Sequence, residues 1–226
     1  GKPAARDFFA VYGDEIAKQF YDEMGIHVIW TDNSAYGQAS KGKKIVHPAD
    51  IKGVKIRTLE TEMMIKTYEV LGALASPVNT SEVYTALQQG TIDAATTNTI
   101  LLDMFNWKEV SDYYLNSKMF VDMGVTFYTD EWYQSLTPEQ QTILDEELAT
   151  FVTEYSQLFD AAEADIIDNL TAAGVEVTEF DSELADEWIE AVQPVYDWFL
   201  TTYGEKYPKL QEYIDAAAEI NAKYLG

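Results

Sequence analysis

Residues 55–98 read KIRTLETEMMIKTYEVLGALASPVNTSEVYTALQQGTIDAATTN, and this stretch decides the fold. Short apolar runs alternate in it with segments of helical periodicity, which is the pattern of a parallel α/β sheet. Ligands of open α/β sheets bind beyond the carboxyl ends of the strands, near a point where the strand order reverses. The polar residues that follow the apolar runs are therefore the first candidates for a binding site.

Four polar residues occupy these strand ends. Arg57 closes the first run, Thr80 follows the second, and Thr97 and Asn98 follow the third. A planar guanidinium can hold a carboxylate through two parallel hydrogen bonds, which an ammonium cannot do. An internal salt bridge would also explain Arg57, and loop capping would explain the other three, so both interpretations stay open at this point.

The flanking sequence supplies further elements of the α/β pattern. An apolar stripe at helical spacing predicts a helix over 4–24, ended by Gly25. A strand over 26–31 and a polar loop over 32–44 follow, and Pro48 begins a short helical turn. The remaining predicted strands cover 54–58, 74–78, 91–95 and 118–129, and the remaining predicted helices cover 60–71, 81–89 and 101–107.

A long helix is predicted in the second half of the chain. Thr137 can cap it, Pro138 fits its first turn and Gln140 can complete a capping box. No helix breaker follows before Gly174. At 1.5 Å per residue such a helix is about 54 Å long, which exceeds the width of a small domain, so it must contact two lobes or a partner chain. A strand over 175–180 and two or three helices over 182–224 complete the prediction.

Composition excludes several classes of function. The 226 residues carry a formal net charge of −24, which repels nucleic acids and anionic membranes. Such acidity suits concentrated salt, so we expect a halophilic protein. The chain has no cysteine, which excludes disulfides and thiol catalysis. No apolar run approaches the roughly 18–20 residues of a membrane helix.

Catalytic and cofactor-binding motifs are missing from the sequence. It contains no G-x-S-x-G, P-loop, G-x-G-x-x-G, H-E-x-x-H or EF-hand pattern. His27 and His47 are the only histidines, and their separation suggests neither a catalytic triad nor a metal pair. We therefore expect no catalytic residue, no metal and no cofactor.

Three segments carry a resemblance to a known family. DIKGVKIR (50–57), LGA (71–73) and PVNTSEVYTALQQGTIDAA (77–95) closely resemble the DctP-type substrate-binding proteins of TRAP (tripartite ATP-independent periplasmic) transporters. The resemblance implies a two-lobed, type II-like periplasmic binding protein with α/β lobes and a lobe-spanning helix. Such a protein closes on a small organic acid and delivers it to the membrane subunits of the transporter.

The same resemblance implies roles for individual residues. Arg57 takes the place of the arginine that grips the ligand carboxylate, and Thr80 stands where an aromatic residue often packs on the ligand. Thr97 holds the place of an asparagine that binds the carboxylate, and Asn98 is shifted from it by one residue. We also expect residues near two positions of the predicted strand 118–129 to line the pocket, namely Met123 and Phe127.

Compared with the family, the chain lacks a substantial N-terminal part, so lobe I is expected to be incomplete. We predict a partial lobe I over 1–53, an intact ligand-binding lobe II over 54–130, and the long helix with C-terminal helices over 131–226. Two alternatives remain. The chain could be an interaction module or sensor that forms a homodimer through the long helix or an open sheet edge. Less favoured is an enzyme of the same fold that uses acids in its cleft.

Overall fold

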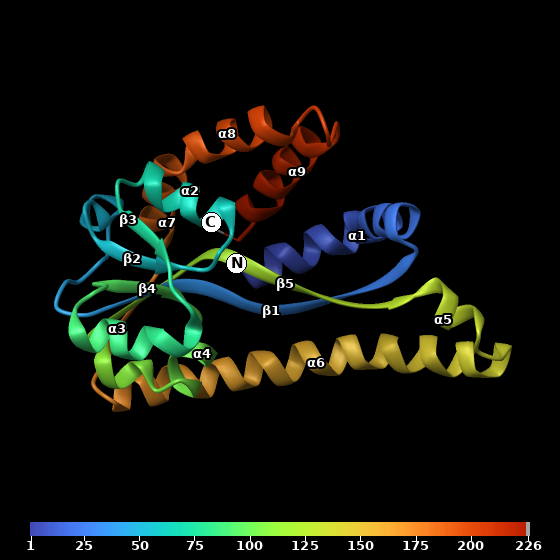
Figure 1. Cartoon of the computed structure of the whole chain (residues 1–226), viewed down its shortest axis with the longest axis horizontal. Helices are drawn as coiled ribbons and strands as arrows, with labels where there is room; N and C mark the ends of the chain where they lie inside the picture. The colour runs from blue at the N-terminus through green and yellow to red at the C-terminus, as the bar shows by residue number, and fades with distance from the viewer. Residues whose placement is uncertain (225–226) are drawn as a thin grey trace.

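A six-stranded mixed sheet forms the centre of the molecule (Figure 1). The computed structural model describes residues 1–224, without the side chains of residues 32 and 33. In spatial order the strands are β3 (Leu74–Pro77), β2 (Lys55–Thr58), β4 (Ala94–Thr97), β1 (Ile26–Ser40), β5 (Tyr113–Thr129) and β6 (Glu176–Glu179). Strand β2 runs parallel to β3 and β4, whereas β1 runs antiparallel to β4 and β5. The predicted parallel sheet therefore holds for residues 55–98, and the rest of the sheet is mixed.

The prediction of a loop over 32–44 is wrong for most of its length. Strand β1 continues to Ser40, and its residues 34–40 are buried. Gln38 pairs with Thr96 on one side and with Leu115 on the other, so the backbone of β1 is hydrogen-bonded at both edges. The polar side chains of this segment suggested a loop because nothing local reveals that two neighbouring strands enclose it.

The helices follow the predicted order. Gly25 ends the first one in the left-handed conformation, with φ of 66°, and Thr137 and Gln140 form the predicted capping box of α6. Helix α6 has 35 residues, which confirms the long helix. The α-helices are α1 (Lys2–Met24), α2 (Glu62–Val70), α3 (Val83–Gln89), α4 (Thr99–Met104), α5 (Asp130–Gln134), α6 (Pro138–Ala172), α7 (Ser182–Ala191), α8 (Gln193–Tyr203) and α9 (Leu210–Ala222), and 3-10 turns lie at Pro48–Ile51, Thr80–Glu82 and Trp107–Val110.

Two hydrophobic clusters cover the two faces of the sheet. On one face, side chains of α3, α4 and the end of α6 pack around Trp107 and Tyr114, both almost fully buried. On the other face, α2 and α7 contribute Tyr68 and Trp188, which pack with Ile56 of β2. Burying these aromatic rings on both sides of the sheet contributes to the hydrophobic stabilisation.

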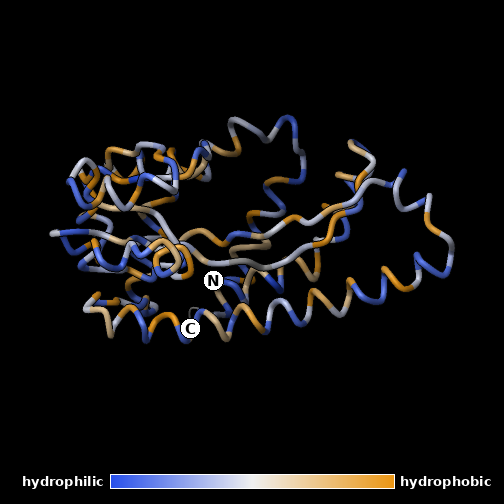
Figure 2. Tube along the Cα trace, turned by 60° about the horizontal axis from the view of Figure 1, so that its bottom comes forward, coloured by the Kyte–Doolittle hydropathy of each residue, from blue (hydrophilic) through white to orange (hydrophobic). Residues whose placement is uncertain are grey.

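Strands β1 and β5 extend far beyond the other strands as a two-stranded ribbon. They pair from Ile26 and Thr129 at one end to Ser40 and Tyr113 at the other. The ribbon runs beside α1 and leads through α5 into α6, which returns along its whole length (Figure 1). Apolar positions recur along this part of α6 (Figure 2), and Ile143 and Leu158 are largely exposed there.

Strands from all three predicted segments join one sheet, because β1 lies in 1–53, β2 to β5 lie in 54–130 and β6 lies in 131–226. The division into a partial lobe I, a lobe II and a helical part stays a prediction. None of the described helices combines the length and the apolar character that crossing a membrane requires.

Candidate functional site

The strand order reverses between β2 and β4. After β2 the chain forms β3 on one side of it, and then returns to form β4 on the other side. Arg57 lies in β2 and Asn98 directly follows β4, so both residues are at the carboxyl ends that flank this reversal. In open α/β sheets this crevice is the usual ligand site, and the sequence analysis expected the site at this edge.

The guanidinium of Arg57 is buried and bound by neutral acceptors. Its Nε donates to the carbonyl of Val78 at 2.9 Å, Nη1 to the carbonyl of Thr96 at 3.1 Å, and Nη2 to the hydroxyl of Thr80 at 3.1 Å. It also lies 5.7 Å from the ring centroid of Trp107. Only 1% of the residue is exposed. Three of the five N–H groups of the guanidinium are used in these bonds, which fix its orientation. Two N–H groups are left to donate to another acceptor.

No carboxylate among the described residues pairs with Arg57, so the internal salt bridge considered from the sequence is not formed. Burial lowers the pKa of Arg57, but an arginine stays protonated in proteins. A buried charge without a counter-ion is costly, and carbonyl oxygens offset only part of that cost. The free energy of binding an anion would therefore be more favourable at this guanidinium than at an exposed arginine.

The structure brings Thr80 directly to Arg57 and places the other two predicted residues nearby. The carboxamide oxygen of Asn98 caps α4 by accepting from the backbone N–H of Leu101 at 2.8 Å. The Thr97 hydroxyl donates to the carbonyl of Asn98 at 3.2 Å and is fully buried. Capping therefore accounts for the Asn98 oxygen, while its amide nitrogen remains a possible donor at the edge of the sheet.

Tyr36 belongs to this group and was missed by the sequence analysis. It is 5% exposed, and burial raises the pKa of its hydroxyl. Asp122 raises that pKa further, while Arg57 and Asn98 lower it, so all three lie within electrostatic reach of the phenol. Tyr36 fell in the segment predicted as a loop. Had the strand been recognised, the alternation of side chains along β1 would have indicated which face of the sheet Tyr36 lies on.

Met123 and Phe127 lie in the part of β5 that pairs with the first half of β1, away from Arg57, and their place in a ligand pocket stays a prediction. Tyr114 lies in the cross-strand row that contains Arg57, and Met123 and Phe127 come much later in the same strand. Their partners in β1, Asp32 and Val28, are seven and eleven residues from Ala39 in that row, so at roughly 3.3 Å per residue they are on the order of 20 and 35 Å along the ribbon from it. The reason is that β5 continues through the ribbon as far as Thr129. Phe127 is 59% exposed on this ribbon.

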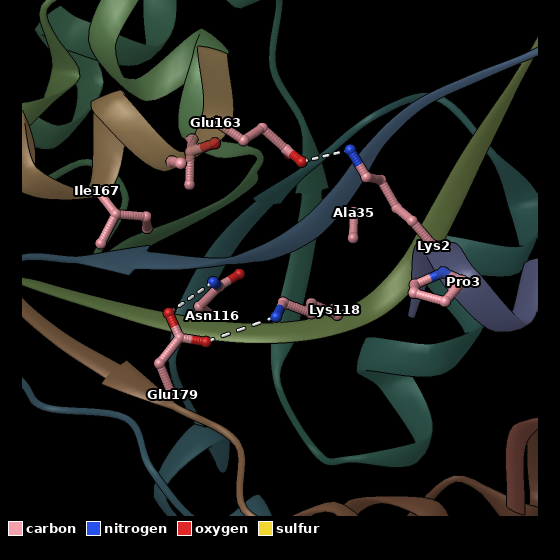
Figure 3. A pocket seen from close by; sticks show the side chains of 10 residues that line it. Lys2, Pro3, Ala35, Asn116, Lys118, Glu163, Ile167 and Glu179 are labelled. Atoms are coloured by element: carbon pink, nitrogen blue, oxygen red, sulfur yellow. Dashed lines mark hydrogen bonds and ion pairs between the residues drawn. The ribbon is translucent and has the colours of Figure 1, made fainter. Parts of the chain in front are cut away.

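A cavity of about 360 Å³ lies beside the place where β1 and β5 leave the rest of the sheet, on the α6 side (Figure 3). Its charged groups are paired with one another. Lys2 contacts Glu163 at 2.5 Å, and Glu179 accepts from Asn116 at 2.8 Å and lies 3.6 Å from Lys118. This cavity adjoins the candidate site through Ala35 and Thr99, the chain neighbours of Tyr36 and Asn98, but Arg57 does not line it.

Metal binding finds no support in the described part of the chain, which holds no cluster of three or more His, Asp or Glu side chains suited to an ion. The candidate site is thus an arginine with hydroxyl, amide and phenol neighbours. This arrangement can bind an anion, and it offers no nucleophile paired with a base.

Comparison with known proteins assigns the family. Residues 4–202 match the model of DctP, the bacterial extracellular solute-binding protein family 7. The chain belongs to the DctP family. Members of this family are periplasmic solute-binding proteins of TRAP transporters and are not enzymes. The chain is 31% identical over 173 residues to the uncharacterized protein YiiZ of Salmonella typhimurium, covering 76% of this chain and 52% of the relative.

Solved DctP-family structures share the fold. A TRAP periplasmic solute-binding protein from Xanthobacter autotrophicus with bound β-D-galacturonate is 30% identical, with a TM-score of 0.81 over 98% of this chain and 71% of the other. A second, from Anaerococcus prevotii with bound D-glucuronate, is 25% identical, with a TM-score of 0.83 over 100% of this chain and 72% of the other. The chain thus spans about half the length of YiiZ and about 70% of these structures.

Proposed function

We propose that this DctP-family chain captures a small organic acid and delivers it to the membrane subunits of a TRAP transporter. The observation that carries the proposal is the buried guanidinium of Arg57, which has no carboxylate partner among the described residues and lies where the strand order reverses. A ligand carboxylate would supply the missing negative charge through a bidentate pair.

The relatives support the acidic nature of the ligand. The solved proteins from Xanthobacter autotrophicus and Anaerococcus prevotii hold galacturonate and glucuronate, and each of these sugars carries one carboxylate. The chain's net charge of −24 disfavours anions at long range, so a local cation is needed to capture one. Arg57 is that cation in the proposal.

Binding in this proposal requires a change of conformation. Arg57 is 1% exposed and Tyr36 5%, so a ligand reaches the guanidinium only when the groups that cover it move. Thr80 then fixes the fork, and Asn98 and Thr97 border the ligand. A ligand that binds one arrangement better than the other shifts the population toward it, and no covalent step is needed.

Titration calorimetry with D-glucuronate, D-galacturonate and uncharged D-glucose tests the proposal on the 226-residue chain. We expect heat of binding with at least one of the two acids and none with glucose. The exposed Lys52→Ala variant, which removes a cation elsewhere, should bind like the parent chain. Absence of binding by both acids, or equal binding of glucose, would contradict the proposal.

Self-association is a second candidate, favoured by the exposed apolar residues of α6. Ile143 is 60% exposed and Leu158 72%. A homodimer through this helix would remove them from water. Light scattering over a range of protein concentrations distinguishes the candidates, because a monomer that binds an acid supports the first and excludes the second.

A further inference from the structure

The side chain of Arg57 lies on the face of the sheet that α3, α4 and α6 cover (Figure 1). In the sheet Arg57 is next to Ala95, which pairs with Ala39 of β1, and neighbours in such a row share a face. Both alanines belong to the hydrophobic cluster around Trp107. Ile56, one residue earlier in β2, belongs to the cluster on the opposite face. Alternation along β2 therefore places the charge of Arg57 in apolar surroundings.

The indole of Trp107 supplies part of these surroundings. Trp107 begins the 3-10 turn Trp107–Val110, which packs against α3 and α4, and only 1% of the residue is exposed. The central carbon of the Arg57 guanidinium, Cζ, lies over the indole at 5.7 Å from the ring centroid. A cation within about 6 Å of an aromatic face is attracted by the negative charge of that face, and tryptophan attracts it most strongly.

This contact matters because Arg57 has no carboxylate partner among the described residues. The attraction between a cation and a ring is stronger where water is excluded, and Arg57 is 1% exposed. Because the ring attracts the charge of the whole group, the contact occupies none of the N–H groups that donate to Val78, Thr80 and Thr96. One N–H group on Nη1 and one on Nη2 remain for a carboxylate.

We propose that Trp107 is a positioning residue that holds the charged end of Arg57 at the end of β2 before the ligand arrives. This inference rests on the proposed function and adds the residue that prepares its cation. Without the indole, a smaller fraction of molecules would keep the guanidinium in the place where a carboxylate can reach it. The apparent dissociation constant of an acid rises in inverse proportion to that fraction.

Fluorination of tryptophan tests this role, because it weakens the negative charge on the ring face and changes the size of the ring little. The chain would be produced with tryptophan, 5-fluorotryptophan, 5,7-difluorotryptophan or 5,6,7-trifluorotryptophan at all five tryptophan positions. Calorimetry would use the acid among D-gluconate, D-glucuronate and D-galacturonate that binds the parent chain most tightly. We expect its dissociation constant to rise step by step, by about fivefold over the series.

Substitutions assign the effect to Trp107. Trp107→Phe keeps an aromatic face, so its dissociation constant should stay within about threefold of the parent, and fluorination of the remaining tryptophans should no longer change it. Trp107→Leu has no such face and should bind about tenfold more weakly. Trp188→Leu is the matched control, because Trp188 is 2% exposed in the cluster on the opposite face. It should lower the thermal midpoint and keep the dissociation constant of the parent.

The outcomes separate this inference from the proposed function. A dissociation constant that fluorination of the parent chain does not change, or that changes equally in Trp107→Phe, would overturn the inference and leave the proposed function standing. The fluorinated chains keep every side chain in place, so this result does not depend on whether Trp107→Leu folds. If the parent chain binds none of the three acids, the proposed function and the inference both fail.

Discussion

The Nη2 of Arg57 donates a hydrogen bond to the Thr80 hydroxyl across 3.1 Å, although 23 residues separate the two in the sequence. This bond joins the end of β2 to the turn that follows β3. The partner is a neutral hydroxyl and not a carboxylate. The bond therefore orients the guanidinium of Arg57 without neutralising its charge.

Replacing Thr80 by valine should weaken acid binding. Valine has the shape of threonine but no acceptor, so Nη2 loses its partner and the fork loses one constraint. One neutral hydrogen bond is worth about 1 kcal/mol, which corresponds to roughly a fivefold rise in the dissociation constant for D-gluconate. Thr85→Val, on the exposed side of α3, is the matched control and should bind like the parent. An unchanged constant in Thr80→Val would show that this hydroxyl does not orient Arg57.

Gly37 should tolerate no side chain. A Cβ at this position would lie 2.1 Å from the carbonyl oxygen of Leu115 and 3.0 Å from the ring of Tyr114. Because a backbone atom cannot yield as a flexible side chain does, we expect Gly37→Ala to lower the free energy of unfolding by about 3 kcal/mol in urea titrations. Gly13→Ala is the control, since its Cβ would be 3.4 Å from Trp30 in a helix, and a change within about 1 kcal/mol is expected. Equal effects would refute the packing argument.

Stability should rise with salt. The net charge of −24 is spread over one small chain, and its self-repulsion disfavours the compact state. Between 0.1 M and 1 M salt the screening length falls from about 10 Å to about 3 Å, which removes most of this repulsion. The thermal midpoint in KCl should therefore increase, and uncharged sucrose at the same osmolality should raise it less. A flat or falling midpoint would argue against a halophilic adaptation.

Alkaline pH should destabilise the fold through Tyr68. Burial raises the pKa of this tyrosine to about 12 from an ordinary value of 10.0. The folded state thus keeps a proton that the unfolded chain releases, so the contribution is fully present below pH 10 and is lost as the pH rises toward 12. The free energy of unfolding should fall over this window, and the fall should be smaller in Tyr68→Phe. The exposed Tyr207→Phe should keep the parent slope, and identical slopes in all three would refute the assignment.

The sequence predicted those parts of the fold that have local causes. The end of α1 at Gly25 and the start of α6 at Thr137 follow from the capping preferences of single residues. The strand ends at Arg57 and Asn98 follow from alternation of apolar runs and helices. In each case the deciding residues are within a few positions of one another.

The errors concern long-range pairing. Whether residues 32–40 form a strand depends on β4 and β5, which pair with them from more than 50 residues away. The same pairing keeps β5 in the ribbon as far as Thr129, so Phe127 lies away from Arg57. No sequence pattern within a short window shows which distant strands will pair. The part of the site on β2 was therefore predictable, and the part on β1 and β5 was not.

Substitution of Arg57 tests the central claim most directly. We would measure the dissociation constant of D-gluconate by calorimetry for the parent chain, Arg57→Ala, Arg57→Lys and the control Lys52→Ala. The account predicts a loss of about 100-fold or more in Arg57→Ala, because two charge-assisted hydrogen bonds disappear, with partial recovery in Arg57→Lys and no change in the control. Binding within about threefold of the parent in Arg57→Ala would contradict the account, since the carboxylate would then be held elsewhere.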